Sequence, residues 1–191
     1  MRTLYAMLAM TVIGCSHGTT GAQHPKADDS QQAAEAEAAM HKLHHAWDTM
    51  DMAAVEDAIS DDGFLTTFEY TESGEAVRLS NKKELVAWLT HQFADIKAAG
   101  GATAAIPQRK MECKASDGVA YCSEECDIYI ARPDGKVALS PHRGTSILRK
   151  GPNGWKFVHW HVSEAAPVRI VAADSPEVAG KLSSSSHSHE H

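Results

Sequence analysis

The chain has 191 residues, of which 43% are hydrophobic, and a formal net charge of −7 at pH 7. A chain of this size can bury one hydrophobic core, with appendages around it, but hardly two. Lysine and arginine form no cluster in the sequence, so nucleic acids and anionic lipid headgroups are excluded as favoured partners.

The first residues predict export to the bacterial cell envelope. Residues 3–14 are largely apolar, but this run is too short to span a bilayer as a permanent helix. It ends in Val12-Ile13-Gly14-Cys15, which resembles the lipobox of bacterial lipoproteins. We expect a signal peptide over residues 1–14, a lipid on Cys15 and a polar linker over residues 15–28. The mature protein would face the periplasm and touch the membrane only through this lipid; an ordinary secretory signal cut elsewhere is the alternative.

Three helices are predicted after the linker. The first has a face of regularly spaced apolar residues, namely Met40, Leu43, Trp47 and Met50. A short second helix should follow Asp51, which is a good N-cap. A third should begin after Asn81, because Asn81 and Glu84 have the spacing of a capping box.

Strand patterns dominate the rest of the chain. Alternating residues predict a strand over residues 64–70 that is followed by a partner over residues 76–79. After the third helix, strands are expected at about residues 104–113, 119–131, 137–150 and 155–163. Helices followed by a long antiparallel meander indicate the α+β class. A disordered tail that contains several histidines is expected over residues 169–191.

The cysteines predict one disulfide. Asp117 and Gly118 form a strong two-residue hairpin signal, and counting back from such a turn places Cys113 directly opposite Cys122. A bridge from Cys122 to Cys126 would have to span about four strand rises, roughly twice what a disulfide tolerates. We therefore expect a Cys113–Cys122 disulfide, with Cys126 as a buried small hydrophobic residue.

The last third of the chain resembles a known family. The resemblance rests on GVAY at residues 118–121, RGTSILRK at residues 143–150 and WKFVHWHVS at residues 155–163. These segments are similar to the closing sheet of SnoaL-like domains, which belong to the nuclear transport factor two-like superfamily and include the association domain of calcium/calmodulin-dependent kinase II. The resemblance implies a cone-shaped, cystatin-like roll over residues 29–168, in which a curved antiparallel sheet wraps around the helices. It also implies a pocket at the mouth of the cone and assembly into dimers or rings.

The resemblance also bears on the pocket. Three arginines that line the pocket of the kinase domain fall on Ser123, Ser146 and Val162, so a cationic pocket is not inherited. The last strand carries large side chains on both faces, and successive side chains alternate between those faces. The resemblance places Val158, Trp160 and Val162 toward the pocket, and therefore Phe157, His159 and His161 toward an outer face or a partner subunit.

Catalytic candidates are few. His159 and His161 share one strand face, and imidazole is the usual side chain for proton transfer near neutral pH. Asp127 is the remaining candidate for a general base. A structural role for the two histidines is preferred over catalysis, because the pair belongs to the sheet packing of the resembled domains. No acidic partner is implied for His44 on the first helix.

Two further sets of residues could bind ligands. Large amphipathic rings can either pack in a core or line a pocket for a flat or apolar ligand. The sequence does not decide between these two roles for five aromatic residues, namely Trp47, Tyr70, Trp88, Tyr129 and Trp160. The tail residues His187, His189 and His191 could bind a borderline metal ion at most weakly, and a solvated tail is the preferred interpretation.

No phosphate-binding glycine loop, nucleophile elbow or zinc motif is recognised in the sequence. The sequence predicts a lipid-anchored envelope protein whose SnoaL-like domain binds a small, partly apolar molecule and forms a homodimer. One alternative is an isomerase- or hydrolase-type enzyme that uses a pocket carboxylate or histidine as a general base. Another is a structural association module. No cofactor is expected.

Overall fold

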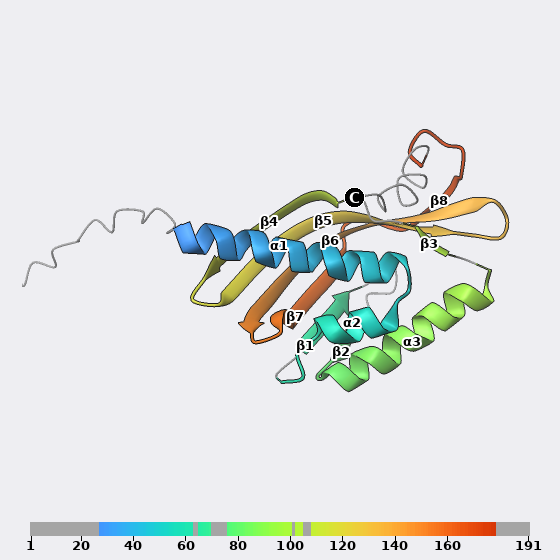
Figure 1. Ribbon diagram of the computed structural model, residues 1–191. Helices are drawn as coiled ribbons and strands as arrows, with labels where there is room; N and C mark the ends of the chain where they lie inside the picture. The colour runs from blue at the N-terminus through green and yellow to red at the C-terminus, as the bar shows by residue number, and fades with distance from the viewer. Residues whose placement is uncertain (1–26, 63–64, 70–75, 101, 105–107, 179–191) are drawn as a thin grey trace, which may run out of the picture.

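The computed structural model describes residues 27–178, apart from gaps at residues 63–64, 70–75, 101 and 105–107. Three helices, α1 (Ala27–Asp48), α2 (Met52–Ala58) and α3 (Lys82–Ala98), lie on one side of a curved sheet (Figure 1). The strands are β1 (Leu65–Glu69), β2 (Ala76–Leu79), β3 (Ala102–Ala104), β4 (Gln108–Ser116), β5 (Val119–Ala131), β6 (Lys136–Gly151), β7 (Gly154–Glu164) and β8 (Arg169–Ala172). The predicted α+β roll is confirmed. In the described part of the chain, no helix is long and apolar enough to cross a membrane.

The sheet is open and mixed. Its strand order is β2-β1-β7-β6-β5-β3, while β4 pairs with the first part of β5 and β8 pairs with the first residues of β6. Among the described strands, every pair is antiparallel except β1 with β7, and the sequence did not suggest this parallel pair. The long chain segment between these two strands removes the directional constraint that a tight hairpin imposes.

Local signals in the sequence position the elements as expected. The Asp51 side chain accepts a hydrogen bond from the Ala54 N–H and caps α2, and the Asn81 side chain accepts one from the Glu84 N–H and caps α3. Asp117 and Gly118 have φ angles of 51° and 76°, as the tight hairpin between β4 and β5 requires. Cys113 therefore lies opposite Cys122 with a Cα–Cα distance of 4.1 Å, and the predicted disulfide is present.

A β-bulge in β7 overturns part of the predicted alternation. His159 pairs with Ile147 and Phe157 pairs with Leu148, so Val158 is an extra residue without a partner on β6. The bulge turns Phe157 to the same inner face as Trp160, and both side chains are buried in the main core. The expectation that Phe157 points outward and Val158 points inward is therefore wrong, whereas Trp160 and Val162 do lie on the inner face.

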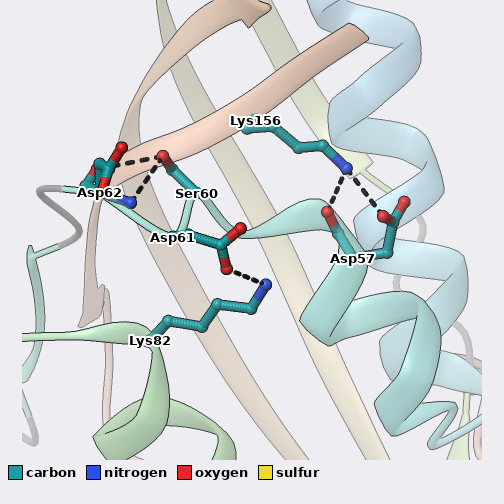
Figure 2. A network of polar contacts seen from close by, with 6 residues as sticks. All are labelled: Asp57, Ser60, Asp61, Asp62, Lys82 and Lys156. Carbon is teal, nitrogen blue, oxygen red and sulfur yellow. Dashed lines mark hydrogen bonds and ion pairs between the residues drawn. The ribbon is translucent and has the colours of Figure 1, made fainter. Parts of the chain in front are cut away.

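Polar contacts fasten the helices around this bulge. Lys156 Nζ donates to the carbonyl oxygen of Asp57 and, at 2.9 Å, to its carboxylate, which joins β7 to the end of α2 (Figure 2). Lys82 Nζ at the start of α3 donates to Asp61 at 2.8 Å. On α1, Glu35 accepts hydrogen bonds from Lys150 and Trp155, and mainly the Lys150 contact lowers the pKa of Glu35 to about 2. These contacts fasten α1 to β6 and β7, α2 to β7, and α3 to the segment that follows α2.

The C-terminal boundary differs from the expectation. Residues 169–178, which we assigned to the disordered tail, form β8 and a turn whose last residue, Val178, is fully buried. Val178 packs with Tyr129, Val137 and Leu139 in a second cluster. Along β5 and β6, these residues alternate with the residues whose side chains face the helices, so this cluster lies on the outer face of the sheet. The segment is ordered because it adds a strand to β6 and covers apolar side chains that water would otherwise reach.

Candidate functional site

A cavity of about 250 Å³ lies between the inner face of the sheet and the helices α1 and α3. Its apolar wall includes three tryptophans, from α1, α3 and β7, and two phenylalanines, from β1 and α3. Its polar side chains come mainly from β5, β6 and β7 and from one turn of α1. The cavity is therefore apolar over much of its wall and hydrogen-bonding where the central strands line it.

The aromatic side chains form one continuous set of ring contacts. Trp47 meets Phe93 and Trp160 edge to face, with ring centroids 5.3 and 5.7 Å apart. Phe68 stacks on Trp88 at 4.7 Å and meets Trp160 edge to face at 5.4 Å. Such contacts add to the stability from area burial and fix ring orientation. The wall is therefore preorganised rather than assembled around a ligand.

A buried acid–base pair joins α1 to β5. His44 Nε2 lies 3.0 Å from Glu124 Oε2, and the two side chains are only 9% and 3% exposed. Gly144 lies opposite Glu124 on β6, and a Cβ atom there would come within 2.9 Å of Glu124 Oε1. The glycine thus provides the space that the glutamate side chain occupies. A buried carboxylate is costly unless it is paired, and His44 supplies the pairing group.

His142 is the second buried imidazole of the cavity. Its Nδ1 lies 2.9 Å from the carbonyl oxygen of Ser140. A carbonyl oxygen can only accept, so Nδ1 carries the proton and Nε2 of the neutral ring is an acceptor. Burial lowers the pKa of His142, although the Ser140 carbonyl and the carboxylates of Glu164, Asp127 and Glu124 act in the opposite direction. His142 is therefore neutral at pH 7 and can accept a proton at Nε2.

The strand register explains why these side chains gather. Cys126 on β5, His142 on β6 and Glu164 on β7 are direct neighbours across three strands and line the cavity together. The next row contains Glu124, Gly144 and Val162. Within the described residues, no group of three or more histidine, cysteine, aspartate or glutamate side chains is arranged to hold a metal ion.

The structure separates the residues that the sequence proposed. Trp47, Trp88 and Trp160 line the cavity, but Tyr129 is buried on the opposite face of the sheet. Of the proposed catalytic residues, none lines the cavity: they are Asp127, His159 and His161. Tyr70, the lipidation site Cys15 and the tail residues His187, His189 and His191 lie outside the described residues.

The buried ionisable residues of the cavity were missed, namely His44, Glu124, His142 and Glu164. A signal existed for two of them. Glu124 interrupts an otherwise apolar alternation of Ala120, Cys122, Cys126 and Ile128 on β5. Glu164 continues the Trp160 and Val162 face of β7. A charged residue on the inner face of a strand is uncommon and indicates a pocket or a buried partner.

Comparisons with known proteins agree with this geometry. A family model described as SnoaL-like domain matches residues 36–168. No curated protein matches the sequence significantly.

Solved structures show the same fold. One is from Novosphingobium aromaticivorans and is named as a proposed aromatic ring hydroxylase, with a TM-score of 0.60, 18% identity and coverage of 78% of this chain and 96% of that chain. Another, from Streptomyces avermitilis, is named as a proposed dehydratase of the nuclear transport factor two-like family. Its TM-score is 0.58 at 16% identity, and the match covers 72% of this chain and 98% of that chain. A third, from Caulobacter vibrioides, is described as having a cystatin-like fold. Its TM-score is 0.55 at 16% identity, and the match covers 72% of this chain and 92% of that chain. At these identities the likeness shows the fold alone.

Proposed function

Because the chain belongs to the SnoaL-like domain family, we propose that its cavity binds a small, partly apolar molecule. The observation that carries this proposal is a preformed cavity in which an aromatic wall adjoins buried hydrogen-bonding groups. Small-molecule sites typically combine a mostly apolar lining with a few placed polar groups. Trp160 supports the same function, because it is 5% exposed and its Nε1 has no hydrogen-bond partner among the described residues.

We also propose that the domain forms a homodimer through the outer face of the sheet. Leu65, His159, Ile147 and Tyr121 are direct neighbours across β1, β7, β6 and β5. The three apolar members of this row are exposed. A row of exposed apolar side chains across four strands is typical of an association surface. A second copy packed on this face would remove it from water.

Two substitutions on opposite faces of β7 test both proposals. Trp160→Ala should weaken ligand binding and leave the dimer intact, because the ring lines the cavity. His159→Asp should split the dimer, because it places an unpaired charge in the apolar row. Light scattering reports the mass, and a fluorescence screen of small aromatic compounds reports binding. The opposite pattern would assign the outer face to the ligand and the inner face to the partner.

We further propose that the protein is anchored to the bacterial cell envelope by a lipid on Cys15. The apolar run and the Val12-Ile13-Gly14-Cys15 motif support this location. Intact-mass analysis of membrane-extracted protein should show acyl groups on Cys15 as the new N-terminus. Recovery as a soluble periplasmic species that begins elsewhere would rule out the anchor.

A catalytic use of the cavity is the second candidate, and His142 is the observation that favours it. Its Nδ1–H is held by Ser140, which leaves Nε2 as a base on the cavity side of the sheet. One similar structure is named as a proposed dehydratase, and dehydration removes a proton from carbon, so we test proton removal beside a carbonyl group. The protein should speed deuterium exchange at the α-carbon of cyclohexanone, and His142→Gln should abolish this. Equal exchange rates with and without protein would count against catalysis of this kind.

A further inference from the structure

The charge of the cavity restricts what it can bind. Two carboxylates that line the cavity beside His142 are almost fully buried: Glu124 and Glu164 are 6% and 8% exposed. Among the described residues that line the cavity, the buried basic side chains are those of His44 and His142, and His44 pairs with Glu124. Arg143 also lines the cavity, but it is exposed and lies in register with Glu125. With one positive charge on His44 at most, the buried groups remain net negative.

The hydrogen-bonding groups have the same bias. Carboxylate oxygens accept hydrogen bonds, and the neutral His142 ring offers Nε2 as an acceptor once Nδ1 has donated to Ser140. A ligand that presents a donor, and above all a charged donor, therefore complements the strands that line this part of the cavity. A carboxylate or phosphate ligand would instead meet like charges in a poorly hydrated space, which is strongly unfavourable.

The aromatic wall fits the same class of ligand. Trp47, Trp88 and Trp160 line the cavity together with Phe68 and Phe93. Organic cations are attracted to the faces of aromatic rings, most strongly to tryptophan. The wall also buries the apolar body of a ligand. At about 250 Å³, the cavity is at the lower end of small-molecule sites and suits one or two rings.

We propose that the cavity takes a small organic cation with a flat apolar body, of the arylalkyl ammonium class, whose charged nitrogen lies toward Glu164 and His142. This inference rests on the proposed ligand-binding function. The aromatic wall would hold the apolar body, and the buried carboxylates would accept hydrogen bonds from the ammonium group.

Three compounds with nearly the same skeleton test the sign of the charge. Phenethylammonium, 2-phenylethanol and phenylacetate differ in formal charge from +1 through 0 to −1, and calorimetry can measure their binding to the full chain. The cation should bind at least about tenfold more tightly than the alcohol, and the anion should bind most weakly. Equal or tighter binding of the alcohol or the anion would overturn the cation preference but leave ligand binding in place. No binding of any of the three would count against both.

A charge-removing substitution tests the residue. Glu164→Gln keeps the side-chain shape and should weaken phenethylammonium binding about tenfold while changing 2-phenylethanol binding little. Glu125→Gln removes the same charge from an exposed position on the neighbouring sheet surface and is the matched control. Equal losses for cation and alcohol in Glu164→Gln, or an equal loss of cation binding in both variants, would overturn the assignment of Glu164.

Discussion

Replacing Phe157 with alanine should lower the free energy of unfolding by about 3–5 kcal/mol, the range for removal of a large buried aromatic side chain. Phe157 has no exposed surface, and its ring lies 6.2 Å from that of Trp160. Its backbone also pairs with Ile59 and accepts a hydrogen bond from Ser60 N–H, so the strand cannot move inward to fill the space. Urea denaturation followed by circular dichroism measures the change.

The neighbouring bulge residue provides the control. Val158 is half-buried and belongs to neither core cluster, so Val158→Ala should cost no more than about 1 kcal/mol. This contrast depends on the bulge. If the strand alternated without interruption, Phe157 would lie outside and Val158 inside, and the valine substitution would be the more costly. Comparable losses in the two variants would therefore contradict the placement of the bulge.

The bulge also shows where sequence reasoning succeeds and where it fails in this chain. Helix caps at Asp51 and Asn81 and the turn at Asp117 and Gly118 depend on residues within three or four positions of one another, so the sequence predicts them well. The disulfide follows from that turn by counting. A bulge inserts one residue without a strong local signal, and every side chain beyond it then changes face.

The candidate site was harder to predict for a related reason. Trp47, Trp88 and Trp160 could be named because aromatic residues are obvious in any sequence. The polar groups could not be paired, because His44 and Glu124 belong to a helix and a strand that are far apart in the chain. Their meeting depends on how α1 crosses the sheet, which no local pattern specifies. For the His44–Glu124 pair, the sequence held two clues: a charged residue on an apolar strand face, and Gly144 at the position opposite it.

Removing His44 should be the most disruptive change in the site. His44→Ala should lower the free energy of unfolding by about 3–5 kcal/mol, because it leaves Glu124 buried without its basic partner. His41→Ala is the matched control on the same helix, since His41 is exposed and its 3.9 Å contact with Glu37 is a surface one. That substitution should cost no more than about 0.5 kcal/mol. Urea denaturation of both variants measures the difference.

A double substitution distinguishes the charge pairing of His44 with Glu124 from the packing of the His44 ring. If His44 matters because it compensates the Glu124 carboxylate, then Glu124→Gln should recover a large part of the stability lost in His44→Ala, since the buried charge is gone. If His44 matters only as a packed ring, the two losses should add. Additive losses would contradict the charge-pairing role. Strong coupling between the two substitutions would mean that the Glu124 carboxylate both holds α1 over the cavity and contributes to the negative charge of the cavity. The charge of a bound ligand and the docking of α1 should then influence each other.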